Sequence, residues 1–492
     1  MSVTAAHRVR VRSVGAVVVL VSAVVLAVAA LGPPAVAGGP GVWTDVSGPV
    51  GGLLVEPRVA RDASGVLHVV WITEENGQDL IHRSIAADGT AGAQQTLAQD
   101  WGGLGNPAIV YDPASATPLT VFAGGIRSST SGDSHDGLNW WTSTDGSTWT
   151  LQPSVVSGPG GIAYSSDVSA VVTPGSVFQT WYGTAGVFSH RGLDNGGDQD
   201  VNDVGTYGYY SAYGYDPIAD RLWIAAAYNA TDKEGIWVRE IDKATGGGAG
   251  ASVLLPQSAT DYEGHVDMSL EEIPLPITGL VGQAGIVVAY PNNYPSVNQV
   301  RVWRIAGGGT TTQLLASGSG TRDVVAVAAT PDGRAWVVWS DTSGSAPRVV
   351  ARRSNVGATT WGAAASVAAP AGTESLWQLA ASAQSDGRLD LLAQGSRSGV
   401  NRIYHTQLYA GLDVTVAPKA AKVKKAFTAT VTVRDAGAPV SGASVSAAGK
   451  TAVTDGSGVA KLQLKAAKAG RLTVTVKKDG YQTATAAVTV TR

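Results

Sequence analysis

The sequence contains no cysteine, so it forms no disulfide bond and uses no thiolate in catalysis. It also contains no P-loop, no HExxH motif, no Ser-His-Asp hydrolase motif and no nucleic-acid-binding motif. Charged residues make up only 15% of the chain. Beyond residue 37, no apolar stretch is long enough to cross a membrane. The fold must therefore rely on an apolar core, for which the chain offers 14 Trp and 15 Tyr.

Residues 1–37 have the pattern of a secretory signal peptide. Basic residues between His7 and Arg12 precede an apolar run from Val14 to Leu31, and residues 35–37 (Ala-Val-Ala) supply a cleavage site. An uncleaved anchor is the alternative, because an apolar run of about 18 residues is near the lower limit for a membrane span. We therefore expect a secreted, extracellular protein that meets the membrane only through this segment, before cleavage.

Charge is divided unevenly along the remaining chain. Residues 38–411 contain 19 Lys and Arg against 34 Asp and Glu, a net charge of −15. Residues 412–492 contain 13 Lys and Arg against 4 Asp, a net charge of +9. Such asymmetry predicts a domain boundary near residue 411. The acidic part repels nucleic acid, so we expect no nucleic-acid partner.

One motif recurs seven times between residues 62 and 395: a turn of Asp, Pro or Gly, then an alternating apolar strand that ends near an aromatic residue in most copies. Six of these strands close on Trp71, Phe122, Trp181, Tyr228, Tyr290 and Trp339, at spacings of 51, 59, 47, 62 and 49 residues. A second apolar element follows each motif and ends in a basic residue in most copies. Four-stranded units at such a period indicate a β-propeller. We therefore predict an all-β chain in which residues 38–411 form a six- or seven-bladed propeller.

The turn STDGSTW, residues 143–149, follows the second copy of this pattern. It resembles the Asp box of the sialidase-like (BNR-repeat) β-propellers, one residue short. The resemblance assigns structural roles to four residues: Ser143, Asp145, Gly146 and Trp149. In such a box the Asp side chain bonds turn N–H groups, the Gly adopts an unusual backbone conformation, and the Trp packs between strands. The box supports the fold and not catalysis, and the sialidase R-I-P motif is absent, with only Arg58 and Arg61 in its neighbourhood.

Residues 412–492 resemble bacterial Ig-like and carboxypeptidase-regulatory-like domains. The resemblance is carried by Gly-Ala-Ser-Val at 442–445, Thr-Asp-Gly-Ser-Gly at 454–458 and Gly-Tyr at 480–481. It implies a small Ig-like β-sandwich used as a spacer or an adhesive module. The Lys excess fits an anionic cell-wall polymer, with a merely soluble surface as the alternative. No LPxTG-like signal follows, so any association with the wall is expected to be loose.

By analogy with other propellers, ligands bind the face built by the loops that join blades and the loops between second and third strands. The candidate catalytic residues lie in two such loops: Asp133, His135 and Asp136 in one, Tyr262, Glu263 and His265 in the other. A carboxylate pair supports glycoside hydrolysis, whereas Tyr with His supports proton abstraction by a polysaccharide lyase. The candidate substrate-binding residues are Asp100, Trp101, Arg127, Arg322 and Glu374.

The stretch HRGLDNGGDQDVND, residues 190–203, contains four Asp residues. Its first half is interpreted as a degenerate Asp-box turn. In its second half, Asp198, Asp200 and Asp203 alternate like the oxygen ligands of a calcium loop, but no bidentate Glu follows. A solvated fourth strand is the alternative. We expect no required cofactor, and Ca²⁺ is the one ion that this loop suggests.

Three functions remain open on the sequence. The first is a glycoside hydrolase or polysaccharide lyase that acts on extracellular glycan. The second is a non-catalytic adhesion protein that binds glycan or the cell wall. The third is a structural surface or spore-coat protein. The first two share glycan as the ligand, and a monomer is expected in each.

Overall fold

The computed structural model describes residues 40–50, 52–74, 78–127, 137–156, 167–183, 186–194, 197–204, 208–228, 235–258, 276–293, 296–322 and 324–492. The regular structure in these residues is β-strand throughout. Across these ranges there is no helix with the length and apolarity that a membrane crossing requires.

Strands β1 to β29 form seven antiparallel sheets, numbered I to VII here. Sheet I contains β2 (Leu53–Arg61), β3 (Leu67–Glu74), β4 (Gln78–Ile85) and β5 (Ala91–Trp101). Sheet II contains β6 (Gly103–Leu104), β7 (Ala108–Tyr111), β8 (Leu119–Ile126), β9 (Gly137–Ser143) and β10 (Thr150–Leu151). Sheet III contains β11 (Val168–Thr173), β12 (Ser176–Gly183), β13 (Gly186–Arg191) and β14 (Gln199–Asp200). Sheet IV contains β15 (Gly208–Asp216), β16 (Arg221–Tyr228), β17 (Gly235–Ile241) and β18 (Gly248–Leu254).

Sheet V contains β19 (Ile277–Gly279), β20 (Ile286–Asn292), β21 (Gln299–Ala306) and β22 (Gly309–Ala316). Sheet VI contains β23 (Val325–Ala329), β24 (Ala335–Asp341), β25 (Arg348–Arg353) and β26 (Ala365–Ala368). Sheet VII contains β27 (Ser375–Ala383), β28 (Leu389–Arg397), β29 (Val400–Leu408) and the distant β1 (Thr44–Asp45).

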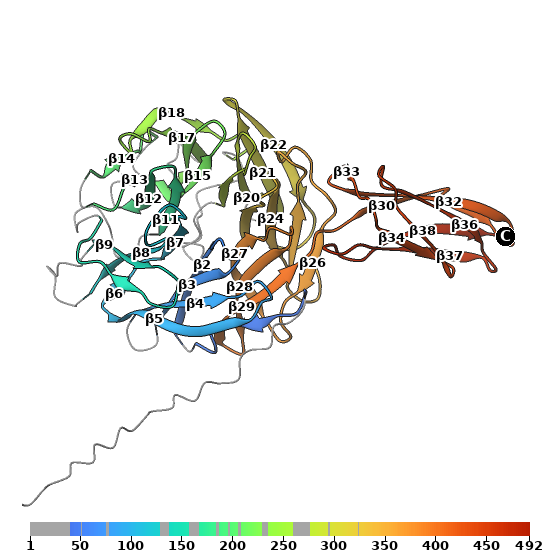
Figure 1. Ribbon diagram of the computed structural model, residues 1–492, viewed down its shortest axis with the longest axis horizontal. Coiled ribbons are helices and arrows are strands. Elements are labelled where there is room, and N and C mark those ends of the chain that lie inside the picture. Colours follow the sequence, from blue (N-terminus) through green and yellow to red (C-terminus); the bar gives the residue numbers. More distant parts are fainter. Residues whose placement is uncertain are drawn as a thin grey trace, which may run out of the picture. The chain divides into compact units, whose positions relative to one another are not determined.

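These sheets surround a common axis (Figure 1). The first strands of six of them, β2, β11, β15, β19, β23 and β27, contribute residues to the lining of one central cavity. Each sheet therefore runs outward from the cavity, which is the arrangement of a β-propeller. The strand pairs predicted from the repeated motif are confirmed as the second and third strands of all seven sheets. The six closing aromatic residues are all buried, so the repeat marks the core.

The ring is closed by pairing the two ends of the propeller sequence. Strand β1 is the outer strand of sheet VII and pairs with β29, with Thr44 opposite His405. At the boundary with sheet I, buried Asp390 of β28 accepts hydrogen bonds from Arg61 Nη2 of β2 at 2.5 Å and from His405 Nε2 at 2.7 Å. Gln384 and Gln407 donate to the same carboxylate. These contacts hold the last sheet of the ring to the first.

The C-terminal strands form two further sheets. One contains β30 (Asp413–Ala417), β32 (Ala426–Asp435), β33 (Ala438–Pro439) and β36 (Val459–Lys465). The other contains β31 (Ala420–Lys422), β34 (Ser444–Ala447), β35 (Lys450–Val453), β37 (Gly470–Lys477) and β38 (Ala484–Thr491). Buried Val, Leu and Ala side chains from both sheets make one core, so this part is a β-sandwich.

The sandwich contacts sheet VI through one buried carboxylate. Asp435, at the end of β32, accepts from Arg353 Nη2 at 2.5 Å and from Arg334 Nη1 at 3.1 Å. The Tyr481 hydroxyl donates to the same oxygen at 3.0 Å, and the Arg353 guanidinium lies over the rings of Trp336 and Tyr481. A buried carboxylate needs such partners, because an unpaired charge is strongly disfavoured away from water.

Candidate functional site

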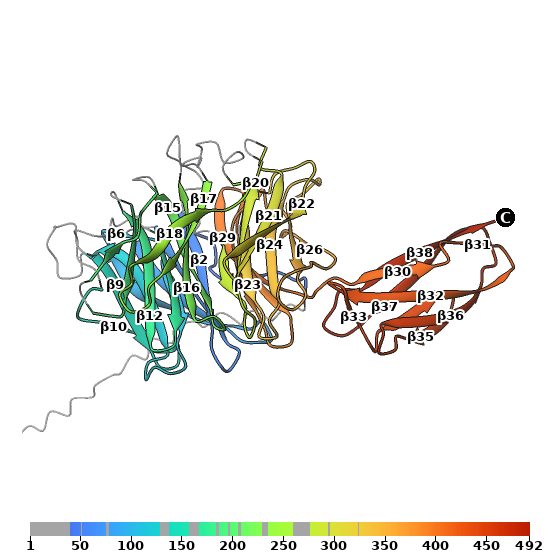
Figure 2. The same ribbon diagram turned by 90° about the horizontal axis from the view of Figure 1, so that it is seen from above.

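The candidate binding face carries the loops that join neighbouring sheets and the loops between second and third strands. Figure 2 shows the strands of the ring running between this face and the opposite one. Each first strand begins at this face, because it follows a joining loop. Residues at the start of the innermost strands therefore lie where the central cavity meets the candidate face.

The central cavity has a volume of about 240 Å³. Its described lining is mostly small and apolar, for example Ala212 of β15, Val325 of β23 and Leu379 of β27. Arg58 of β2 is the only charged residue among the described residues that line it. It lies at a register shift between Val55 and Arg58 in the pairing of β2 with β3. A guanidinium among small side chains at a cavity favours a polar or anionic group of a ligand.

Trp377 is a large, solvent-exposed aromatic side chain near this cavity. It lies on β27, two residues before Leu379 of the cavity lining, and its side chain is 45% exposed. A register shift between Leu376 and Gln378 places it in an irregular part of the strand. Its indole N–H donates to the hydroxyl of Ser375. An indole held in this way offers a flat apolar surface to a ligand.

The six candidate catalytic residues lie outside the described residues: Asp133, His135, Asp136, Tyr262, Glu263 and His265. Their assignment to hydrolysis or lyase chemistry therefore stays a prediction. In the described part of the central cavity no two carboxylates meet, since its described lining contains no Asp or Glu.

Two of the five candidate substrate-binding residues are buried. Trp101 is 5% exposed and packs against Trp141, with ring centroids 5.6 Å apart. Its ring is so tightly enclosed that a Cβ on Gly125 would lie 2.9 Å from it. Arg322 is also 5% exposed; its Nη1 donates to the Asn298 carbonyl at 2.8 Å, and its Nη2 lies 3.6 Å from Asp341. In this structure neither side chain presents the sugar-stacking or carboxylate-clamping surface expected from the sequence, because packing and internal hydrogen bonds occupy both.

The other three candidate substrate-binding residues are exposed. Asp100 itself has φ of 55°, and its N–H donates to Asp79 at 2.8 Å. Arg127 directly follows β8. Glu374 precedes β27 and accepts from the Ser398 N–H at 3.1 Å. Glu374 is therefore three residues from Trp377. The sequence did not indicate Trp377 as a binding residue, because an isolated Trp at the start of a strand carries no periodic signal.

The turn at residues 143–149 is held by hydrogen bonds to its own side chains. The Asp145 carboxylate accepts from the Ser147 N–H at 2.8 Å, and Ser143 Oγ accepts from the Gly146 N–H at 2.8 Å. Gly146 has φ of 72°, a conformation that favours glycine. Trp149 lies against the His82 ring of sheet I, with centroids 4.9 Å apart. The turn thus joins sheets I and II on the face opposite the candidate site.

The acidic stretch at 190–203 connects β13, β14 and the segment after it. His190 lies one residue before the end of the third strand, is fully buried, and has Nδ1 2.9 Å from Asp198. Asp200 accepts from the Asn202 N–H at 2.9 Å, and Asp203 accepts from the Ser252 N–H at 2.9 Å.

The three carboxylates proposed as calcium ligands thus engage separate partners. No group of three His, Asp or Glu side chains in the described ranges is arranged to hold a metal ion. The calcium site at Asp198, Asp200 and Asp203 stays a prediction, without converging ligands in the described part of this loop.

The sequence matches no protein-family model and no curated protein, but solved structures resemble the fold. A lectin, BP39L from Burkholderia pseudomallei, is 15% identical, covers 71% of this chain and 95% of its own, and superposes with a TM-score of 0.51. A protein of unknown function from Dyadobacter fermentans is 13% identical, over 74% of this chain and 97% of its own, with a TM-score of 0.42. The polysaccharide lyase Uly1 is 8% identical, over 72% and 89%, with a TM-score of 0.41. At these identities the likeness to the lectin supports the fold alone.

Proposed function

We propose that this protein is a secreted, carbohydrate-directed β-propeller that binds extracellular glycan over its central cavity. The observation that carries the proposal is the exposed Trp377 at the start of β27, beside a cavity whose described lining has Arg58 as its only charge. A sugar ring stacks its apolar face on an indole, and a guanidinium binds a carboxylate or hydroxyl group. The lectin that shares this fold is consistent with such a ligand.

Several finer assignments belong to the same proposal. Each of the seven sheets is one blade of a seven-bladed, sialidase-like propeller, supported by the sheet topology and by the Asp-box turn. Residues 412–492 form an Ig-like module, supported by the two packed sheets. Residues 1–37 are a signal peptide, so that the mature, monomeric chain starts at Gly38 and is released from the cell or loosely bound to its wall.

A glycan screen on residues 38–492 tests this function by measuring both binding and released sugar. We expect the wild-type chain to bind a defined set of glycans. Trp377→Ala should weaken that binding at least about fivefold, whereas Trp377→Phe keeps a ring and retains most of it. Both variants should unfold at the wild-type temperature, because the side chain is exposed. Absence of glycan binding, or equal binding by Trp377→Ala, would refute the proposal.

Two further arms of the screen address the predictions that the described residues leave untested. Sugar release that disappears in Asp136→Asn or Glu263→Gln would identify a hydrolase or lyase and place its catalytic loop. Loss of binding in EDTA, restored by calcium, would support the calcium loop at Asp198, Asp200 and Asp203. Binding that is indifferent to EDTA and yields no product identifies a lectin-like protein.

A further inference from the structure

The charges of the sandwich are separated between its two ends. The four Asp residues of 412–492 lie together: Asp413 begins β30, Asp435 ends β32, Asp455 lies just before β36, and Asp479 follows β37. We call this the near end, because Asp435 contacts sheet VI there. The antiparallel pairing of β30 with β32 and of β32 with β36 fixes these positions.

The opposite, far end of the sandwich is basic. The end of β36 approaches the start of β32 there, since the Lys424 N–H donates to the Ala466 carbonyl at 2.8 Å. The C-terminal end of β38 joins them, since the Val423 N–H donates to the Thr491 carbonyl at 2.9 Å. Eight exposed basic residues lie at or beside this end: Lys419, Lys422, Lys424, Lys425, Lys465, Lys468, Arg471 and Arg492. Since all four Asp residues are at the near end, no carboxylate side chain of the sandwich offsets this charge.

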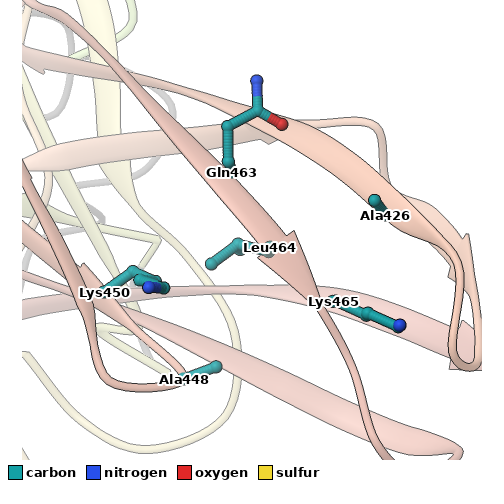
Figure 3. A pocket seen from close by; sticks show the side chains of 6 residues that line it. All are labelled: Ala426, Ala448, Lys450, Gln463, Leu464 and Lys465. Carbon is teal, nitrogen blue, oxygen red and sulfur yellow. The ribbon is translucent and has the colours of Figure 1, made fainter.

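A pocket of about 230 Å³ opens between the two sheets, in the half of the sandwich toward the far end (Figure 3). Lys450 of β35 comes from one sheet, and Lys465 of β36 from the other. Leu464, Ala426 and Ala448 give the pocket an apolar lining, and Gln463 adds an amide. Lys450 and Lys465 thus give two positive charges to the lining of a space below the roughly 300 Å³ of a drug-sized site, whereas Leu464 is buried in the core and the Gln463 amide donates to Thr428 Oγ1 at 2.8 Å.

We propose that this far-end pocket binds one acidic sugar residue of an anionic polysaccharide. The sugar carboxylate pairs with the Lys450 and Lys465 ammonium groups, and the small side chains of Ala426 and Ala448 in the same lining leave room for the ring. The flanking acidic residues of the polymer lie along the other far-end basic side chains. A recessed pocket suits a polymer unit better than a flat membrane surface, which would meet the far end without entering it. This site is separate from the central cavity, so it extends the proposed function to a second contact with glycan.

The test uses residues 38–492 with polygalacturonate as the probe and neutral dextran as the control polymer. The variant Lys450→Gln/Lys465→Gln removes both pocket charges, and Lys477→Gln/Lys478→Gln removes two charges from the near end. We expect the pocket variant to bind polygalacturonate at least about tenfold more weakly, since it loses two charge-assisted hydrogen bonds. The near-end variant should stay within about twofold of wild type, because screening at 0.15 M salt leaves distant charges little influence. Dextran should not bind this site.

Three results would overturn the proposal. The first is an equal loss in both double variants, which would mean a general charge effect. The second is no binding of polygalacturonate by the wild-type chain. The third is binding to phosphatidylserine vesicles but not to the polymer, which would assign the far end to a membrane. Trp377→Ala should bind polygalacturonate normally at this site, so failure of the central-cavity proposal is distinguishable. Thermal unfolding of each variant confirms that it folds.

Discussion

Two buried histidines at the boundary between sheets I and II predict an acid-sensitive step in stability. His68 Nδ1 lies 3.1 Å from His82 Nε2, and each side chain is 1% exposed. His68 Nε2 lies 3.4 Å from Asp62, and His82 Nδ1 lies 2.9 Å from Gln95 Oε1. Trp149 of the turn at residues 143–149 packs against the His82 ring. The pair is thus enclosed by groups from both sheets.

The hydrogen bonds determine which ring atom of His82 carries the proton. The amide nitrogen of Gln95 donates to the Ser147 carbonyl, which leaves the Gln95 amide oxygen facing His82 Nδ1. Because that oxygen can only accept, His82 Nδ1 must donate. Nε2 of neutral His82 then accepts from His68 Nδ1. A second proton on His82, at Nε2, would point its N–H at the N–H of His68 Nδ1, so the hydrogen bond between the two rings would be lost. Burial, together with the positive charge of His68, lowers the pKa of His82 to about 4, against the hydrogen bond to Gln95.

The consequence for stability follows from the two pKa values of His82. Between its ordinary pKa of 6.5 and the folded value of about 4, the unfolded chain binds a proton that the folded chain does not. Stability is therefore fully present above pH 6.5 and is lost as the pH falls toward 4. A difference of about 2.5 pKa units, at 1.36 kcal/mol each, gives a loss of about 3 kcal/mol. His68 adds to the loss in the same direction, because burial lowers its pKa too.

Selective ¹³Cε1-histidine labelling measures this pKa directly, because the chain contains only seven histidines. The signal missing from His82→Gln should titrate near pH 4 in the folded wild type. Urea unfolding at pH 7 and pH 4.5, followed by Trp fluorescence, should show a smaller acid-induced loss of stability in His82→Gln than in wild type. A midpoint near pH 6.5 for that signal, or the same pH dependence in both proteins, would refute the reasoning.

Three further substitutions test contacts that hold the sheets together. Asp390→Asn should lower the free energy of unfolding by about 3–5 kcal/mol, because it breaks a buried, multiply paired carboxylate; a change under about 1 kcal/mol in urea unfolding contradicts this. Gly146→Ala should lower the melting temperature more than Gly175→Ala, since both have positive φ but only the first places a Cβ 2.2 Å from His68; equal shifts contradict the clash. Asp435→Asn should speed proteolysis between residues 408 and 413, where the sandwich joins sheet VI; an unchanged cleavage rate contradicts a role for this carboxylate.

The repeated strands were predictable because their signal is local. Trp71, Trp181 and Trp339 close short apolar runs bounded by turn residues, and such a run predicts a buried strand without reference to distant partners. Each of these residues is buried in the second strand of its sheet. The turn at residues 143–149 is local too, since Asp145 accepts a hydrogen bond from Ser147 of the same turn, and its assignment as an Asp box stays a prediction.

The closure of the ring and much of the binding face were not predictable, because they depend on distant partners. Strand β1 is two residues long, too short to show any period. Arg61 is near the position where a sialidase-like clamp would begin, yet it donates to Asp390, 329 residues away. An aromatic side chain such as that of Trp101 can stack on a sugar ring, but Trp101 packs inward against Trp141. A residue type indicates what a side chain can bind, and only the packing decides whether a ligand can reach it.

Two buried carboxylates join parts of the chain that are far apart in sequence. Asp390 joins the last sheet of the ring to the first, and Asp435 joins the sandwich to sheet VI. Neither carboxylate can reach its arginine until both partner elements have formed. Before that, burial of either charge is disfavoured, so each pairing favours complete assembly over partly assembled states. In a chain without disulfides, such pairings make the closing of the ring and the docking of the sandwich cooperative with the folding of the sheets they connect.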